Sequence, residues 1–212
     1  MSGATAALTG GSLISGGLLF LVGAARWKPR EYQQPLPEAM RRMDADAPRV
    51  RAIFRWMSVG VCVTTGAIAA LVSLEIDTVG FPMAFVALTL FVVGAAAMLA
   101  NLLFGLTVLP WGAQTITRTG SLPAGFEAWK GWADLCYGLH MILSYAAIGL
   151  LGWSILASKI VSPWLGWAGI FFGVAWCVGF ARFRSGPFAP PILVHVWPFA
   201  IGVALVVQAI GG

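Results

Sequence analysis

Charged residues are scarce in this sequence. Only 10% of its 212 residues are Asp, Glu, Lys or Arg, whereas 59% are hydrophobic. A soluble globular domain carries about 25% charged residues and keeps most of them at its surface. The shortage therefore excludes an ordinary water-soluble domain and indicates that the chain is solvated by lipid.

Cysteines are few, and catalytic motifs are missing. The three cysteines are far apart and show no CxxC spacing, so the sequence predicts neither a disulfide framework nor a redox motif. No HExxH, GxSxG, Walker-type or Rossmann-type glycine motif occurs in a fitting context. We therefore assign no catalytic residue and no metal ligand from the sequence.

Long apolar segments recur along the whole chain. Each approaches the roughly 20 residues that a helix needs to cross a hydrocarbon core about 30 Å thick. No linker or second composition regime divides the chain, so we treat residues 1–212 as one domain. The fold class predicted is all-α, a bundle of six transmembrane helices. The expected spans are 4–25, 52–74, 81–109, 135–157, 163–181 and 190–210.

Lys and Arg are distributed unevenly among the loops. Twelve of the thirteen fall in the loops after the first, third and fifth spans, and only Lys159 lies elsewhere. Basic residues near span ends are retained in the cytoplasm, so the loop 26–55 is expected there and both termini outside, in a bacterial inner membrane. The first basic residue, Arg26, follows the first apolar run, so we expect that span to be retained. Topology accounts for the net charge of +5, and no nucleic-acid partner is expected.

The first cytoplasmic loop contains the longest polar segment. Pro37 suits the first turn of a short helix, and the residues after it alternate between apolar and basic in a helical pattern. We expect an interfacial helix with one side on the membrane and the other in water. Its membrane side would be Ala39, Met40 and Met43, and its water side Arg41 and Arg42.

Proline and acidic residues mark the ends of several spans. Asp46 and Pro48 are typical of a helix start and predict the beginning of the second helix. Pro110 is expected to stop the third helix. Between these two spans, Glu75 and Asp77 form a short acidic turn on the outer side.

The two histidines are the most informative polar residues within the spans. His140 lies ten residues after Lys130, and His195 lies eleven residues after Arg184, on two helices that run in the same direction. They should therefore sit at nearly equal depth. Two imidazoles at matched depth could ligate one b-type haem, although simple hydrogen bonding between helices is the competing explanation.

Other polar groups within the spans are few. Asn101, Tyr137 and Ser144 are the interior candidates, and they offer little polarity for a substrate path. Pro198 could kink the sixth helix beside His195, as in many transporters. The cysteines in the same half of the bundle as the histidines are better explained as small space-filling residues than as ligands. They are Cys136 and Cys177.

Small residues form faces suited to close helix packing. Ser12 and Gly16 share one face of the first helix, and Gly169 and Gly173 share one face of the fifth. Such faces let other helices approach closely. Besides the bilayer, we therefore expect other membrane subunits, or a second copy of the chain, as partners.

The segment from Ala147 to Gly179 combines a glycine-rich helix with the helix start Pro163-Trp164-Leu165-Gly166-Trp167 and the Gly169/Gly173 pair. It resembles a group of small uncharacterised bacterial six-helix membrane proteins. The likeness covers at most a third of the chain. It implies the same fold and carries no assigned activity.

The sequence thus favours a structural or accessory subunit of an inner-membrane complex. The alternative is a b-type haem electron carrier with His140 and His195 as ligands. A small-molecule transporter is the second alternative.

Overall fold

The computed structural model describes residues 2–28, 35–183 and 190–211, and all regular structure in these ranges is helical. Six helices are long and apolar enough to cross a membrane, which confirms the predicted six-helix bundle. Two shorter helices accompany them. In chain order the helices are α1 Gly3–Ala24, α3 Leu36–Ala45, α4 Ala47–Ser73, α5 Phe81–Leu106, α6 Val108–Thr119, α7 Phe126–Ser158, α8 Pro163–Phe183 and α9 Leu193–Gly211.

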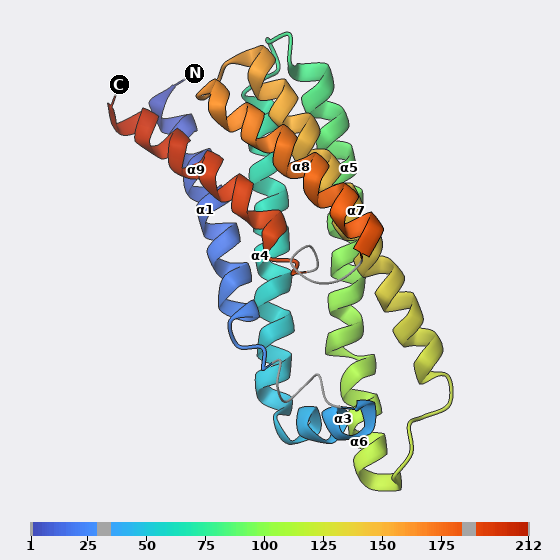
Figure 1. The fold of residues 1–212 in the computed structure, drawn as a ribbon. Helices are drawn as coiled ribbons and strands as arrows, with labels where there is room; N and C mark the ends of the chain where they lie inside the picture. The colour runs from blue at the N-terminus through green and yellow to red at the C-terminus, as the bar shows by residue number, and fades with distance from the viewer. Residues whose placement is uncertain (1, 29–34, 184–189, 212) are drawn as a thin grey trace.

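The long helices form a curved row in the order α9, α1, α4, α5, α7, α8 (Figure 1). Helix α9 also contacts α7 and α8, although less extensively, so the two ends of the row meet. The main core is built from buried apolar residues of α1, α4, α5, α7 and α9. Phe180 is the only residue of α8 among the buried members of this core.

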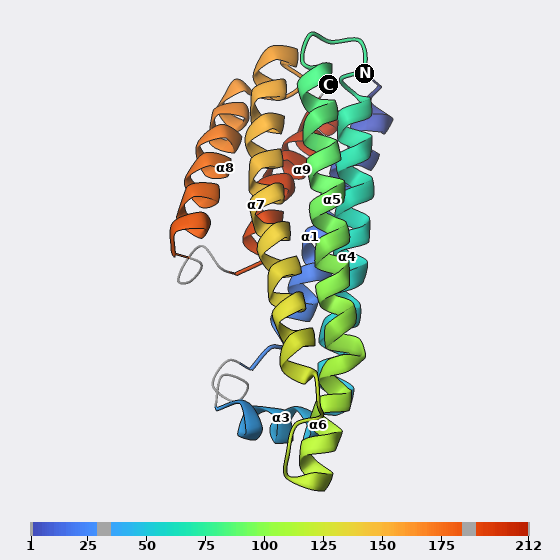
Figure 2. The same ribbon diagram turned by 90° about the vertical axis from the view of Figure 1, so that its right-hand side faces the viewer.

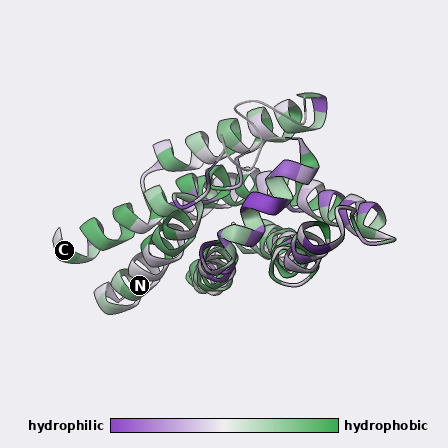
Figure 3. Cartoon of the chain, turned by 90° about the horizontal axis from the view of Figure 1, so that it is seen from below, coloured by the Kyte–Doolittle hydropathy of each residue, from purple (hydrophilic) through white to green (hydrophobic). Residues whose placement is uncertain are grey.

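The molecule has two distinct ends. The start of α1, the end of α9 and the turn between α4 and α5 lie at one end, which we call the terminal end (Figures 1 and 2). Helices α3 and α6 lie at the other, which we call the basic end. Figure 3, drawn from the basic end, shows hydrophilic residues on the short helices nearest the viewer. Arg30 and Arg184 lie outside the described residues.

The helices differ in how far they reach. At 1.5 Å per residue, the 21 residues of α8 and the 19 of α9 span about 30 Å, which matches one hydrocarbon core. The 33 residues of α7 span about 50 Å. Figure 2 shows α8 and α9 ending well short of α3 and α6. The bundle therefore carries a small helical extension at the basic end.

Helix α3 forms where Pro37 predicts it, but its apolar side does not face the membrane. Ala39, Met40 and Met43 are buried, and the two methionines pack on α6 in a separate apolar cluster. The expectation of a membrane-facing side is wrong, because the neighbouring α6 supplies an apolar surface that covers it. The cluster consists of Met40, Met43, Val50, Ala113, Ile116 and Phe126.

Pro110 does not stop the third helix. The helix breaks earlier, at Thr107 (φ −121°, ψ −65°), and α6 then begins with Pro110 in its first turn. The ring of a proline clashes with the carbonyl of the residue four positions earlier, here Leu106, so α5 cannot continue through Pro110. In the first turn of a helix the missing N–H of proline costs nothing, because N–H groups there have no partner within the helix. Helix α6 and the start of α7 make most of the stretch between 110 and 134 helical.

Two helices begin before their expected apolar spans. Helix α4 begins at Ala47, directly after Asp46, which confirms the helix start predicted from Asp46 and Pro48 and lies five residues before the span 52–74. Helix α7 begins at Phe126 and not at residue 135, after Gly125 in a left-handed conformation (φ 82°). Hydropathy shows where a helix enters the lipid. Both helices begin before that point, in the helical extension outside the hydrocarbon core.

We expect α7 and α8 to separate when Gly173 is enlarged. A Cβ at Gly173 would lie 2.5 Å from the Gly149 backbone nitrogen and 2.6 Å from the Tyr145 carbonyl oxygen. Gly173→Ala should therefore destabilise the bundle by about 1–3 kcal/mol in detergent unfolding measurements. Gly138→Ala is the matched control, since a Cβ there meets nothing within 4 Å. Equal effects of the two substitutions would contradict this packing.

Candidate functional site

The two histidines lie inside the bundle. His140 on α7 is 2% exposed and His195 on α9 is 3% exposed. Their helices are in contact, and the two imidazoles are close enough to interact electrostatically. The tertiary structure therefore places the two candidate residues near each other in the core.

His195 joins three helices. Its Nδ1 lies 3.0 Å from the Thr64 hydroxyl of α4. Its ring packs on Phe20 of α1, with 4.3 Å between ring centroids. The close approach of α1 and α4 at Gly16 supports this contact, because a Cβ there would lie 2.7 Å from the Thr64 backbone nitrogen.

His140 joins α7 to α5. Its Nδ1 lies 3.0 Å from the Gly94 carbonyl oxygen and 3.1 Å from the Ser144 hydroxyl. A carbonyl oxygen only accepts hydrogen bonds, so Nδ1 carries the proton that it donates to Gly94. The Nε2 of a neutral His140 then holds an unshared electron pair.

Both Nε2 atoms are buried and have no hydrogen-bond partner among the described residues. A ring whose Nδ1 donates to a carbonyl while its Nε2 is free has the arrangement of a metal-ligating histidine. His140 therefore suits a haem iron, whereas the Nδ1 of His195 contacts a hydroxyl that can donate or accept. A porphyrin would have to displace the surrounding packing, because both rings are buried and Phe20 packs on the His195 ring.

The other interior candidates serve as contacts between helices. The Asn101 side chain donates to the Ala133 carbonyl at 2.9 Å, which joins α5 to α7. Tyr137 packs edge-on against Phe180 of α8. Of this group, only Ser144 lies beside a histidine.

The small residues predicted to pack against other helices differ in their surroundings. Gly169 lies against the Trp197 ring, where a Cβ would come within 2.7 Å, and Gly173 lies against the backbone of α7. The Trp197 indole also donates to the Leu165 carbonyl at 2.9 Å. Ser12 is partly exposed on α1.

The cysteines do not gather into a metal site. No group of three or more His, Cys, Asp or Glu side chains that could hold a metal ion occurs in residues 2–28, 35–183 and 190–211. The Cys177 thiol instead lies 3.9 Å from the Ile142 carbonyl, and Cys62 is exposed.

The inward side of α7 is apolar between its two polar positions. Ser144 and Ser154 are both buried, and Ala147, Ile148 and Leu151 between them are fully buried as well. A polar path along α7 is therefore interrupted for about two helical turns. This arrangement gives little support to a transport route through the bundle.

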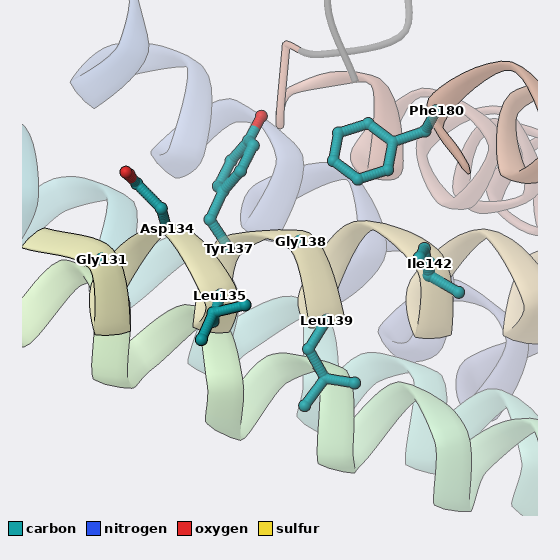
Figure 4. Close-up of a pocket in the computed structure, with 8 residues that line it drawn as sticks. All are labelled: Gly131, Asp134, Leu135, Tyr137, Gly138, Leu139, Ile142 and Phe180. Carbon is teal, nitrogen blue, oxygen red and sulfur yellow. The ribbon is translucent and has the colours of Figure 1, made fainter. Parts of the chain in front are cut away.

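A surface groove lies where α7 passes the end of α8 (Figure 4). It has a volume of about 690 Å³, and its polar groups are the Asp134 carboxylate and the Tyr137 hydroxyl. Lys130 already pairs with Asp134 at 2.8 Å. The remaining lining is Gly131, Leu135, Gly138, Leu139, Ile142 and Phe180, as suits a groove facing lipid.

Sequence reasoning missed Glu75. The sequence places it in a short acidic turn on the outer side. Its side chain is 0% exposed, and its carboxyl contacts the Ser154 hydroxyl of α7. Its position could have been read from spacing, because Ile68, Leu71 and Glu75 continue one helical face past the end of α4.

Comparison of the chain with protein-family models, with curated proteins and with solved structures gives no match.

We expect the Thr64–His195 hydrogen bond to stabilise the packing of α4 on α9. Thr64→Val keeps the side-chain shape but leaves a buried ring nitrogen without a partner, so it should cost about 1–3 kcal/mol in detergent unfolding. Thr65→Val is the control, because the Thr65 hydroxyl donates only to Val61 of its own helix. Equal stability of the two variants would refute this role.

Proposed function

We propose that this integral membrane protein is an accessory subunit of a membrane complex and that its partner packs along α8. The observation that carries the proposal is the poor coverage of this helix. Only 28% of the most apolar stretch of α8 is buried, compared with 39–50% for the other five spanning helices.

The uncovered side of α8 is a continuous stripe of large apolar side chains. Its members recur at alternating spacings of three and four residues, which places them on one face of a helix. Trp164 is 81% exposed and Phe171 is 68% exposed. We define the α8 stripe as Trp164, Trp167, Phe171, Val174 and Val178.

The opposite side of α8 is already used. Gly166, Gly169 and Gly173 are buried against α7 and α9. An apolar groove of about 440 Å³ runs beside the stripe between α7 and α8, and Val174 and Val178 belong to both surfaces. Helix association in lipid depends on close van der Waals packing, and a groove beside a ridge of side chains supports such packing.

The distribution of charge supports an inner-membrane orientation with the basic end in the cytoplasm. Lys159 is the single Lys or Arg of the described chain at the terminal end. Retention of basic residues on the cytoplasmic side would place the ends of α1 and α9 outside. The resemblance of 147–179 to small six-helix bacterial membrane proteins agrees with this proposal.

The partner can be located by crosslinking from α8 in native membranes. A photoreactive phenylalanine analogue in place of Phe171 should give one discrete protein adduct. The same analogue in place of Phe85 should give none, since Phe85 is a comparable phenylalanine, 57% exposed, on α5. Only lipid adducts at position 171, or equal protein adducts at both positions, would refute a partner on α8.

A second candidate, a b-type haem electron carrier, is favoured by one specific observation. His140 and His195 each have a buried Nε2 without a described partner. Binding would require the helices around Phe20 to separate and admit the macrocycle.

The haem candidate is tested by the reduced-minus-oxidised absorption spectrum of the purified protein. It predicts a Soret and an alpha band that are lost in His140→Ala and in His195→Ala. Tyr137→Phe is the control and should retain both bands. A colourless protein after expression with added haem would eliminate this candidate.

A further inference from the structure

The turn between α4 and α5 carries one carboxyl group into the bundle. Glu75 is 0% exposed, and its Oε2 is in hydrogen-bond contact with the Ser154 hydroxyl of α7. The other charged side chains at this end, Asp77 in the same turn and Lys159 at the end of α7, are exposed. No ion pair joins Glu75 to either of them in the described part of the chain.

Gly80 completes the surroundings of this carboxyl. Its carbonyl oxygen lies 2.9 Å from the Ser154 hydroxyl. A Cβ at Gly80 would lie 2.8 Å from Glu75 Oε2 and 2.6 Å from the Ser154 carbonyl oxygen, so no other residue fits without movement. The absence of a side chain lets the α5 backbone approach the carboxyl and the serine together.

The hydrogen bonds allow the protons to be counted. The Ser154 hydroxyl has one proton and contacts two oxygens, Glu75 Oε2 and the Gly80 carbonyl oxygen. One serine proton cannot serve both acceptors fully. A proton on Glu75 supplies the second hydrogen bond, because Glu75 can then donate to Ser154 while Ser154 donates to the Gly80 carbonyl.

We propose that Glu75, Ser154 and the Gly80 carbonyl form a proton-binding site at the terminal end of the bundle. A proton held there completes a chain of two hydrogen bonds, from Glu75 to Ser154 and from Ser154 to Gly80. These two hydrogen bonds connect the α4–α5 turn to α7. Loss of the proton leaves a buried negative charge and only one proton for the two contacts.

The energetics of the surroundings favour the protonated form. Glu75 Oε1 and the Ser158 hydroxyl are buried and have no hydrogen-bond partner among the described residues. An unpaired buried carbonyl oxygen of a neutral acid costs far less than an unpaired buried charge. Burial raises the pKa of Glu75 above its ordinary value of 4.5, against the hydrogen bonds that the Ser154 and Ser158 hydroxyls would donate to the ionised carboxylate.

The raised pKa makes stability depend on pH in one direction. A carboxyl whose pKa is higher in the folded state contributes most below the unfolded value, and its contribution falls as pH rises through the folded pKa. Rising pH should therefore loosen the α4–α5 turn.

Infrared spectroscopy of the intact protein in sodium-free buffer tests the site directly. The wild type should show a carboxylic-acid C=O band that persists above the pH at which an exposed glutamate ionises and disappears as pH rises further. The band should be absent in Glu75→Gln and unchanged in Asp77→Asn, the control in the same turn. Thermal stability should fall with rising pH in the wild type more than in Glu75→Gln.

Two results would overturn the proposal. One is a wild-type spectrum identical to that of Glu75→Gln in the acid C=O region at every pH. The other is loss of the band on addition of Na⁺ at constant pH, which would make the cluster of oxygens a cation site. If Glu75→Gln does not fold, Ser154→Ala tests the site instead. This substitution removes the acceptor of the Glu75 proton, so the carboxylic-acid band should shift to higher frequency. An unshifted band would refute the site.

Discussion

Close approach of helix backbones is the interaction on which the rest of this structure depends. Lipid tails are as apolar as leucine, so burying apolar side chains gives helices little reason to associate in a membrane. Glycines replace that driving force by bringing backbones together, as at Gly10 with Gly202 and at Gly152 with Gly166. Each of these pairs excludes a Cβ on both sides, and together they join α1 to α9 and α7 to α8.

The buried polar groups lie where the close approach of helices lets them reach a partner. His195 contacts Thr64 across α4 and α9, His140 contacts Gly94 across α5 and α7, and Glu75 contacts Ser154 at the terminal end. The two histidine contacts each join two helices, and the Glu75 contact joins the α4–α5 turn to α7. Each also leaves one buried polar atom without a described partner, which is rare in folded proteins.

The fold was largely predictable, because a span needs only length and low polarity, and both are properties of contiguous residues. The errors concern residues whose neighbours are distant in sequence. Met40 was expected on the membrane because nothing in its own segment reveals α6, and Pro110 was expected to end a helix that breaks at Thr107 instead. The candidate site was less predictable: spacing alone gave a matched depth for the histidines but not their partners, and it missed Glu75.

By itself, the sequence determined that six apolar helices cross the membrane and that basic residues gather in alternate loops, because hydrophobicity and charge act through local composition. Only the tertiary structure decided what the polar residues contact. Thr64 and His195 are 131 positions apart, and Glu75 and Ser154 are 79 apart. Their pairing depends on which helices become neighbours and on their relative height, and these follow from the fit of whole helix surfaces rather than from any single segment.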